Sequence, residues 1–311
     1  MNDPMISDRP PLISLFRILI VVVLFGWVIL GQVLALVVAA LHYDGNLINA
    51  FADPINHPDL RDTILLSQGI AAFTGFILVP WFYLKVSEKR ELTIFFRNEG
   101  QWPLLILAVM VAVIGLSVSI SPVAEWNAGF QFPDWMSGFG RWVQETEAMA
   151  EAIIKSITSN MTPLTFIFTF IVMAIIPAVG EELVFRGLIQ TELQRAVRNP
   201  HVAIWVTSIL FSAFHLQFLG FVPRLMIGAF LGYLYFWSGN LWIPILGHFF
   251  NNGLQLIGLY LYQKGFISFD VESTDGAPWP LVATSLLLTA LLLLFLKNYF
   301  QSRLSTTRDI T

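Results

Sequence analysis

The chain has 311 residues, of which 56% are hydrophobic and 12% are charged, and its mean hydropathy is +0.70. A soluble domain carries about 25% charged residues, so this chain has too little polar surface to cover a globule. The net charge of −4 and the lack of a basic cluster argue against nucleic-acid binding. The absence of cysteine excludes disulfides, cysteine-ligated metals and thiol nucleophiles.

Apolar stretches of membrane length recur along the sequence. A bilayer span needs about 20 apolar residues, and its backbone must be helical. The sequence therefore predicts an all-α, polytopic transmembrane helical bundle with about eight spans, at 14–41, 63–84, 102–120, 162–178, 201–217, 224–238, 241–262 and 280–297. The first stretch exceeds the 7–15 apolar residues of a signal peptide, so we expect it to be retained. A further helix at 179–197 should continue the fourth span after a kink at Pro177 and Gly180.

Basic residues concentrate in alternate loops. They follow the second span, the 179–197 helix and the eighth span: Lys85, Lys89, Arg90, Arg97, Arg195, Arg198, Lys297, Arg303 and Arg308. Cytoplasmic loops of membrane proteins carry an excess of Lys and Arg. With eight spans these loops all fall on one side, so we expect a multi-pass protein of the cell (inner) membrane with both termini in the cytoplasm.

The chain divides into four predicted regions. Residues 1–120 form N-terminal transmembrane helices, and 121–161 form an extracytoplasmic loop with an interfacial amphipathic helix at "QETEAMAEAIIKSITS". That helix is interpreted as an interfacial anchor, with a substrate-access lid as the alternative. Residues 162–262 form the core that carries the motifs below, and 263–311 form the last transmembrane helix and a cytoplasmic tail.

A few polar residues fall within the predicted spans. A charge at the bilayer centre costs about 2.5–3.5 kcal/mol, so such residues usually face the interior of the bundle. They are Arg17, Glu181, Glu182, Arg186, His215, Arg224 and His248, with Asn251 and Asn252 beside the last. Arg17 is expected to reach the cytoplasmic interface, and Arg224 receives no role from the sequence.

The "GEELVFRG" segment contains two adjacent glutamates, of which only one is placed to pair with the arginine. Glu182 and Arg186 are spaced i,i+4 with the acid first, the favourable order for a helical ion pair. Glu181 lies about 100° around the helix and cannot share Arg186 as well. It is therefore a carboxylate either facing water at a helix end or free for chemistry.

Two further helices supply histidine and asparagine. "LFSAFHLQF" places His215 near the end of the fifth span, and "GHFFNN" places His248 and Asn252 at i,i+4 on one helix face. Interhelical hydrogen bonding is the structural alternative. Together, a carboxylate, two histidines and an amide can deprotonate a water and stabilise an oxyanion. HExxH and GxSxG motifs and paired aspartates in the spans are all absent.

The three segments resemble a known family. "EELVFRG", "FSAFH" and "HFFNN" are similar, in order, to the EExxxR, FxxxH and HxxxN motifs of the CPBP (CAAX protease and bacteriocin-processing, or Abi) intramembrane proteases, relatives of the type II CAAX prenyl endopeptidases. The resemblance covers roughly residues 162–262. It implies that Glu181 is the general base and that His215 helps to hold the water. His248 and Asn252 would bind the oxyanion, and Glu182 with Arg186 would support the site.

The resemblance leaves the metal question open. The family is commonly described as metallopeptidases, yet these residues also allow a metal-free glutamate mechanism, which we favour. In the alternative, Glu181, His215 and His248 ligate a divalent metal such as zinc, and Glu181 could then not easily act as the base. No other cofactor is implied.

The function expected from the sequence is an intramembrane endopeptidase of CAAX-protease-like type. Its partners would be the lipid bilayer and a peptide or membrane-protein substrate, with no nucleic acid. The first alternative is a non-catalytic membrane scaffold or bacteriocin-immunity-type protein of the same fold. A transporter ranks last, because transporters often show inverted repeats and no internal repeat is found.

Overall fold

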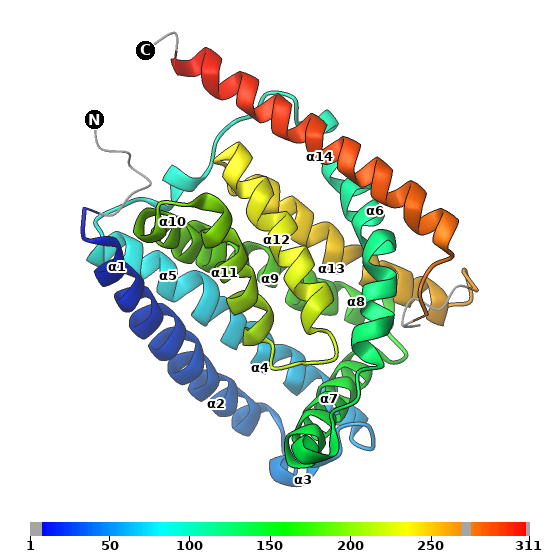
Figure 1. The fold of residues 1–311 in the computed structure, drawn as a ribbon. Coiled ribbons are helices and arrows are strands. Elements are labelled where there is room, and N and C mark those ends of the chain that lie inside the picture. Colours follow the sequence, from blue (N-terminus) through cyan, green and yellow to red (C-terminus); the bar gives the residue numbers. More distant parts are fainter. Residues whose placement is uncertain (1–7, 269–274, 309–311) are drawn as a thin grey trace.

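The computed structural model describes residues 8–268 and 275–308. Throughout these ranges the regular elements are helices, with no strand, and they pack side by side as a bundle (Figure 1). The expected all-α transmembrane fold is confirmed.

Several long helices are built from consecutive shorter segments. The first runs through α1 (Pro11–Arg17), a π-helical segment (Ile18–Gly31) and α2 (Gln32–His42). After α3 (Leu47–Ala52), the next comprises a 3-10 turn (Pro58–Leu60), α4 (Arg61–Phe73), a π-helical segment (Thr74–Leu78), α5 (Val79–Phe82) and a last π-helical turn (Tyr83–Ser87). A 3-10 turn (Leu92–Phe95) precedes α6 (Trp102–Ala128), and another (Asp134–Met136) precedes α7 (Ser137–Thr158).

The second half of the chain carries the motifs. Its first helix combines α8 (Pro163–Phe170), a π-helical segment (Ile171–Ile175), α9 (Ile176–Glu182), a π-helical segment (Leu183–Gln190) and α10 (Thr191–Val197). It is followed by α11 (Pro200–Phe214), α12 (Phe221–Ser238), α13 (Trp242–Gln263) and α14 (Trp279–Arg308). Helical segments thus occur at all eight predicted spans.

Five helices of the described chain are long and apolar enough to cross a membrane: Pro11–His42, Pro58–Ser87, Trp102–Ala128, Pro163–Val197 and Trp279–Arg303. The other three predicted spans correspond to α11, α12 and α13. α11 has only 15 residues, and α13 carries His248 and two asparagines within its 22 residues. These helices are short or relatively polar for a span, so the number eight stays a prediction.

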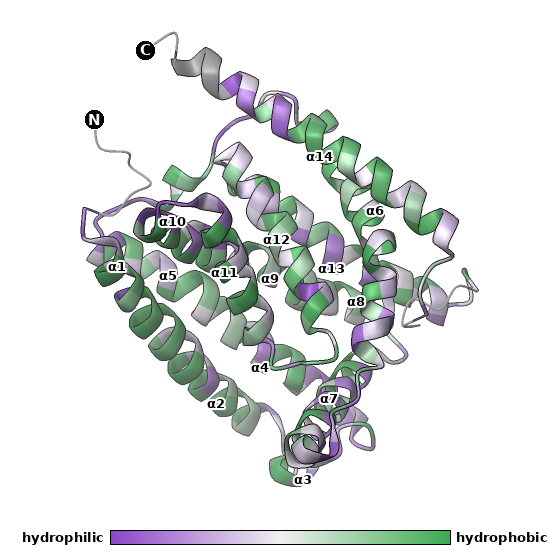
Figure 2. Cartoon of the chain, in the orientation of Figure 1, coloured by the Kyte–Doolittle hydropathy of each residue, from purple (hydrophilic) through white to green (hydrophobic). Residues whose placement is uncertain are grey.

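The outer helices present apolar side chains to the surroundings. Leu36 on α2 and Leu287 on α14 are 65% and 63% exposed, and Figure 2 shows α2 as a mainly hydrophobic ribbon. Exposed apolar surface on this scale marks a membrane-facing protein. The chain is an integral membrane protein.

Helix α9 packs closely against the second span. Gly180 faces Phe76, so closely that a Cβ added at Gly180 would lie 2.6 Å from the Cβ of Phe76. Phe76 in turn stacks on Trp27 with ring centroids 4.4 Å apart. The glycine therefore lets α9 approach the second span, and this contact fixes the position of the neighbouring Glu181.

The predicted kink of the motif helix takes a specific form. Pro177 has no N–H to donate to the carbonyl four residues earlier, that of Met173. The helix remains continuous, and π-helical segments lie on both sides of α9, at Ile171–Ile175 and Leu183–Gln190. Such π-helical turns are frequent at functional sites.

Candidate active site

The expected ion pair within the motif helix is confirmed. Nη1 of Arg186 donates to Oε1 of Glu182 at 2.7 Å, and both side chains are fully buried. Nη2 of Arg186 donates to the carbonyl of Gly228 on α12 at 2.9 Å, and the guanidinium lies 4.6 Å from the ring centre of Phe211 on α11. The pair therefore ties α9 to two neighbouring helices.

Glu182 also holds His248, a contact that sequence reasoning missed. Nδ1 of His248 lies 2.8 Å from Oε1 of Glu182. A carboxylate accepts hydrogen bonds, so Nδ1 carries the proton. The ring is fixed in orientation, and its other nitrogen, Nε2, is turned toward Glu181.

Glu181 is the least bonded charged group of the site. Its Oε2 lies 4.0 Å from Nε2 of His248, and this atom is buried without a hydrogen-bond partner among the described residues. The side chain keeps 13% of its surface exposed. Glu181 and Glu182 are thus adjacent in sequence but differ in surroundings, as their helical positions predicted.

His215 comes to the same site from the end of α11. Its Nδ1 lies 2.9 Å from the carbonyl oxygen of Phe211, and a carbonyl can only accept, so Nδ1 is the donor. Nε2 is therefore the acceptor nitrogen of the neutral ring. The rings of His215 and His248 both pack on Phe211, with ring centroids 5.2 and 5.9 Å away, so the two histidines reach the same site.

Asn252 lies one turn beyond His248 on α13 and has its own fixed partners. Its Nδ2 donates to the carbonyl of Met173 at 3.2 Å, the carbonyl that Pro177 cannot reach. Its Oδ1 accepts from Nδ2 of Asn251 at 3.0 Å. An amide nitrogen carries two hydrogens, so one N–H of Asn252 remains for a ligand.

The two unassigned arginines have different surroundings. Arg17 donates to Oε1 of Glu88 at 3.3 Å and to the hydroxyl of Ser87, so it ties the first span to the end of the second. Arg224, in the first turn of α12, donates to the carbonyl oxygen and the side chain of Gln217, two residues beyond His215. It therefore lies beside the loop that follows His215, which the sequence alone did not reveal.

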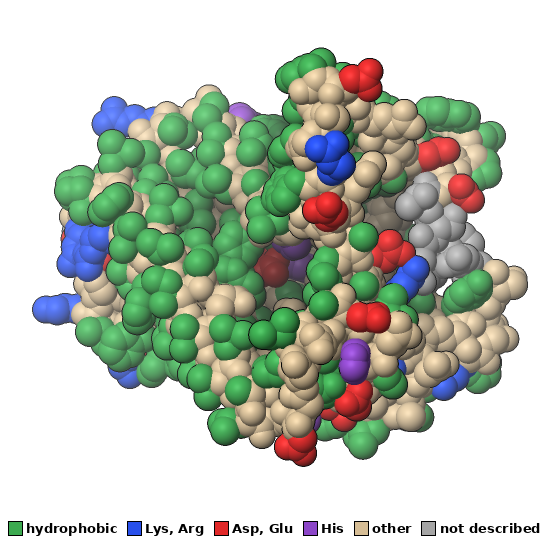
Figure 3. All heavy atoms as spheres, turned by 90° about the horizontal axis from the view of Figure 1, so that it is seen from below, with side chains coloured by type: hydrophobic (Ala, Val, Ile, Leu, Met, Phe, Trp, Pro, Cys, Tyr) green, Lys and Arg blue, Asp and Glu red, His purple; other side chains and the backbone are tan. Residues whose placement is uncertain are grey.

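Access to the site is limited by packing on one side. All residues of the π-helical segment Leu183–Gln190 are buried, so the bundle is closed between Glu181 and α10. Figure 3 shows the opposite situation on the face seen from below Figure 1. A hollow near its centre has acidic and histidine side chains at its floor.

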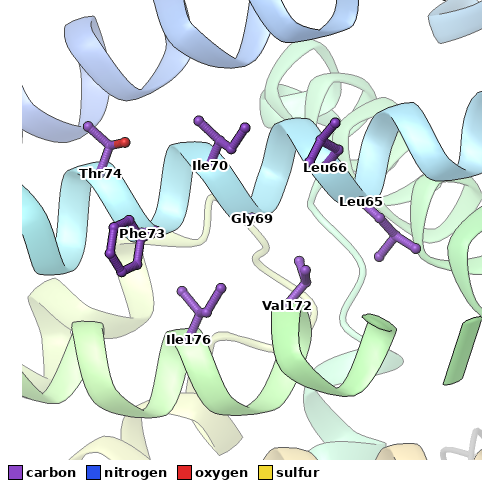
Figure 4. Close-up of a pocket in the computed structure, with 8 residues that line it drawn as sticks. All are labelled: Leu65, Leu66, Gly69, Ile70, Phe73, Thr74, Val172 and Ile176. Carbon is purple, nitrogen blue, oxygen red and sulfur yellow. The ribbon is translucent and has the colours of Figure 1, made fainter. Parts of the chain in front are cut away.

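An apolar groove lies beside the motif helix, between α4 and the segment that leads into α9 (Figure 4). Its volume is about 280 Å³, and its lining residues are Leu65, Leu66, Gly69, Ile70, Phe73, Thr74, Val172 and Ile176. Ile176 begins α9, five residues before Glu181. The groove therefore runs along the helix that carries Glu181, although about 140° separates Ile176 from Glu181 around the helix axis.

α7 covers the region where α11 ends. Oε1 of Glu147 accepts the backbone N–H of Leu219 at 2.9 Å, and Phe139 and Trp142 pack on Phe218 with ring centroids 5.1 and 6.3 Å apart. The amphipathic helix is therefore fastened to the loop that follows His215. Both interpretations of this helix, anchor and lid, are compatible with that contact.

Imidazole nitrogens and a carboxylate oxygen are common metal ligands, but in the described structure those of this site are not close together. Both Nδ1 atoms of His215 and His248 are engaged, which leaves their Nε2 atoms and Oε2 of Glu181 as the available ligands. Across residues 8–268 and 275–308, no three His, Cys, Asp or Glu side chains come together closely enough to hold a metal ion.

Comparison with known proteins supports the resemblance seen in the motifs. Residues 163–254 match the family described as Rce1-like, type II CAAX prenyl endopeptidase. This range includes Glu181, Glu182, Arg186, His215, His248 and Asn252, and it lies within the 162–262 region assigned from the sequence. The resemblance to these endopeptidases is confirmed.

Two curated relatives come from Bacillus subtilis (strain 168). "Uncharacterized protein YpbD" is 34% identical over 83 residues, which are 25% of this chain and 39% of YpbD. "Putative membrane peptidase YdiL" is 25% identical over 199 residues, which are 63% of this chain and 74% of YdiL. The match thus spans less than half of the first relative and about three quarters of the second. No solved structure matches the chain.

Proposed function

We propose that this chain, whose residues 163–254 match the type II CAAX prenyl endopeptidases, is an intramembrane endopeptidase. One observation carries the proposal. Glu181, a carboxylate with an unbonded oxygen, lies 4.0 Å from Nε2 of His248, while the other ring nitrogen is held by the buried Glu182–Arg186 pair. A carboxylate beside an oriented imidazole, inside an apolar bundle, is suited to activating water.

The distance between Glu181 and His248 suits a bridging water. A separation of 4.0 Å is too long for a direct hydrogen bond, and one water can bond to both atoms. Glu181 takes a proton from this water, and the hydroxide oxygen attacks the carbonyl carbon of the scissile peptide bond. This water donates one hydrogen to Glu181 and the other to Nε2 of His215, and it accepts from Nε2 of His248 when that ring carries both protons.

The charge that develops on the carbonyl oxygen needs donors. The second N–H of Asn252 supplies one, since its first goes to Met173. His248 donates from Nε2 only when both ring nitrogens carry a proton, because Nδ1–H already points at Glu182. Glu181 then passes its proton to the leaving nitrogen, the C–N bond breaks, and a carboxylate and an amine are released.

A divalent metal such as zinc is the alternative means of activating water. Glu181, His215 and His248 would hold it through Oε2 and the two Nε2 atoms only after moving closer together than they stand in the described structure, and it would act as a Lewis acid. Glu182 and the carbonyl of Phe211 would then fix the two rings from the other side, as outer partners of metal-bound histidines commonly do.

The proposed substrate is a peptide or membrane protein presented within the bilayer. The apolar groove between α4 and the segment that leads into α9 supports this setting, because it offers an apolar chain a place along the helix that carries Glu181. Both termini are proposed to lie in the cytoplasm, on the strength of the basic loops.

The test uses the purified full-length chain in detergent with a fluorogenic prenylated CAAX peptide and a mixed peptide library. Wild type is compared with Glu181→Ala and His248→Ala, each with and without a chelator. Cleavage by wild type that both substitutions abolish supports the proposal, and its sensitivity to the chelator decides between the two means of activating water. A folded wild type that cleaves nothing would favour a membrane scaffold.

A further inference from the structure

Arg224 is a charged residue beside the loop that follows His215, and among the described residues its hydrogen-bond partner is the neutral Gln217. Its Nη1 and Nη2 donate to the carbonyl oxygen and to Oε1 of Gln217, at 3.4 and 2.9 Å. Gly220 leaves room for the guanidinium, since a Cβ there would lie 3.1 Å from Nη2. The loop between α11 and α12 therefore holds the side chain without neutralising it.

Geometry places Arg224 beside the site through Gln217, which lies two residues beyond His215. Glu147 reaches the same loop at Leu219, and the charges that act on Arg224 include Glu147 and Glu181. No ion pair joins Arg224 to a carboxylate within the described part of the chain, and Oε1 of Glu147 instead accepts the N–H of Leu219. An arginine inside a membrane bundle without a contacting counter-charge is costly, and such residues usually serve a ligand or a pathway.

We propose that Arg224 is a specificity-determining residue that binds a carboxylate of the substrate while the scissile bond lies against Glu181. This inference rests on the proposed peptidase function. A guanidinium presents five N–H groups in a planar fork that matches a carboxylate. Gln217 accepts from two of the nitrogens, so donors remain for a substrate.

The proposal also explains how an anionic substrate approaches an acidic site. A substrate carboxylate close to Glu181 would be repelled by it, and the cost rises where water is scarce. Arg224 offsets this repulsion from the α12 side. The carboxylate belongs either to the C-terminus of the substrate or to an aspartate or glutamate side chain. In both cases the guanidinium of Arg224 would pair with two carboxylate oxygens.

Three fluorogenic peptide libraries separate these sources. The first has free C-terminal carboxylates and lacks Asp and Glu, the second has amidated C-termini and contains Asp and Glu, and the third is amidated and lacks both residues. Each is incubated with full-length wild type and with Arg224→Gln, Arg224→Lys and Arg141→Gln. Arg141 is an exposed arginine on α7 and serves as the matched control for loss of one positive charge.

We expect wild type and Arg141→Gln to cleave the first or the second library about tenfold faster than the third, because the unpaired Arg224 rejects substrates that lack its partner. In Arg224→Gln this ratio should fall to about one, and Arg224→Lys, which keeps the charge but loses the fork, should fall in between. Equal cleavage of all three libraries by wild type overturns the proposal, as does a ratio unchanged in Arg224→Gln.

A binding measurement makes the inference independent of turnover. The Glu181→Gln variant, with and without Arg224→Gln, is mixed with each library, and the shift of its unfolding temperature is recorded. A larger shift with a carboxylate library that Arg224→Gln removes supports the anion site, even if wild type hydrolyses nothing and the peptidase proposal fails. If wild type hydrolyses the peptides without preferring a carboxylate library, only the proposed role of Arg224 is overturned. If there is neither hydrolysis nor a carboxylate-dependent shift, the peptidase function and the role of Arg224 are both overturned.

Discussion

Nδ1 of His248 lies 2.8 Å from Oε1 of Glu182, although the two residues are 66 positions apart in the chain. The same carboxylate oxygen accepts from Arg186 at 2.7 Å. One buried acid therefore serves an arginine on its own helix and a histidine on α13. Oε1 of Glu182 thus contributes both to the stability of the protein and to the orientation of the His248 ring. Substitutions of the Glu182–Arg186 pair should therefore lower stability, whereas substitutions of Glu181 should lower activity.

Replacing Arg186 with methionine should lower the free energy of unfolding. Glu182 would remain as a buried charge without its cation, and breaking one side of a buried pair costs about 3–5 kcal/mol. The loss is measured as the change in the free energy of unfolding in detergent. The double variant Glu182→Gln, Arg186→Met should lose less than the sum of the two single changes.

The chain offers a matched control for this prediction. Lys155 and Glu151 on α7 are also spaced i,i+4 and lie 2.6 Å apart, but their side chains are 52% and 64% exposed. Lys155→Met should change the free energy of unfolding by less than about 1 kcal/mol. If Arg186→Met were as mild as Lys155→Met, burial would not be what makes the first pair important.

One of the two contacts of Glu182 could be predicted from the sequence and the other could not. The Glu182–Arg186 pair was predictable because helical spacing alone brings positions i and i+4 together. The bond between Glu182 and His248 was not, since it depends on how α9 and α13 pack. The polarity of His248 and Glu182 in apolar segments indicated that both face inward, but not that they meet.

Asn252 illustrates a similar limit. Its position on the face of His248 followed from the i,i+4 spacing, whereas its bond to the carbonyl of Met173 required the helix packing. A signal for it was present nonetheless, because Pro177 deprives that carbonyl of its usual donor. Arg224 was visible as a charge in a span, but its bonds to Gln217, two residues beyond His215, depend on the α11–α12 loop.

The number of spans is the feature of the fold that composition predicts least well. Helices that face lipid are apolar all round, so α2 and α14 were readily predicted. α12 and α13 carry polar residues because they are surrounded by other helices, and α11 is short. Length and hydropathy therefore identify the outer spans, and the helix Pro163–Val197 that carries Glu181, more surely than α11, α12 and α13.

Gly180→Ala should disturb both stability and activity. The new Cβ would lie 2.6 Å from the Cβ of Phe76, and forcing extra volume into a packed contact typically costs about 1–3 kcal/mol. Relief of the clash moves α9, and with it Glu181, so peptide cleavage should fall as well. Unfolding temperature and cleavage rate are both measured.

Gly138→Ala is the corresponding control. Gly138 lies in the first turn of α7 with no atom within 4 Å of its added Cβ, so alanine should leave stability unchanged or raise it by up to about 1 kcal/mol. Equal effects of the two substitutions would mean that the close approach of α9 to Phe76 is not required.

The two nitrogens of His215 can be tested separately. Asparagine at this position places an amide nitrogen near Nδ1 and keeps the bond to Phe211, whereas glutamine places its amide near Nε2. We expect both variants to fold, His215→Asn to lose about 10²–10⁴-fold in cleavage rate, and His215→Gln to retain more. A reversed order would place the function of His215 in its bond to Phe211 rather than in Nε2.

The account depends above all on Glu181 being the group that activates water. The most direct measurement is the rate of peptide cleavage by Glu181→Gln relative to wild type, with the unfolding temperature of both proteins recorded in the same detergent. Because Oε2 of Glu181 has no hydrogen-bond partner among the described residues, the unfolding temperature should be unchanged. The rate should fall at least about 100-fold. A folded Glu181→Gln protein that cleaves within about threefold of the wild-type rate would contradict the assignment of Glu181 as the base.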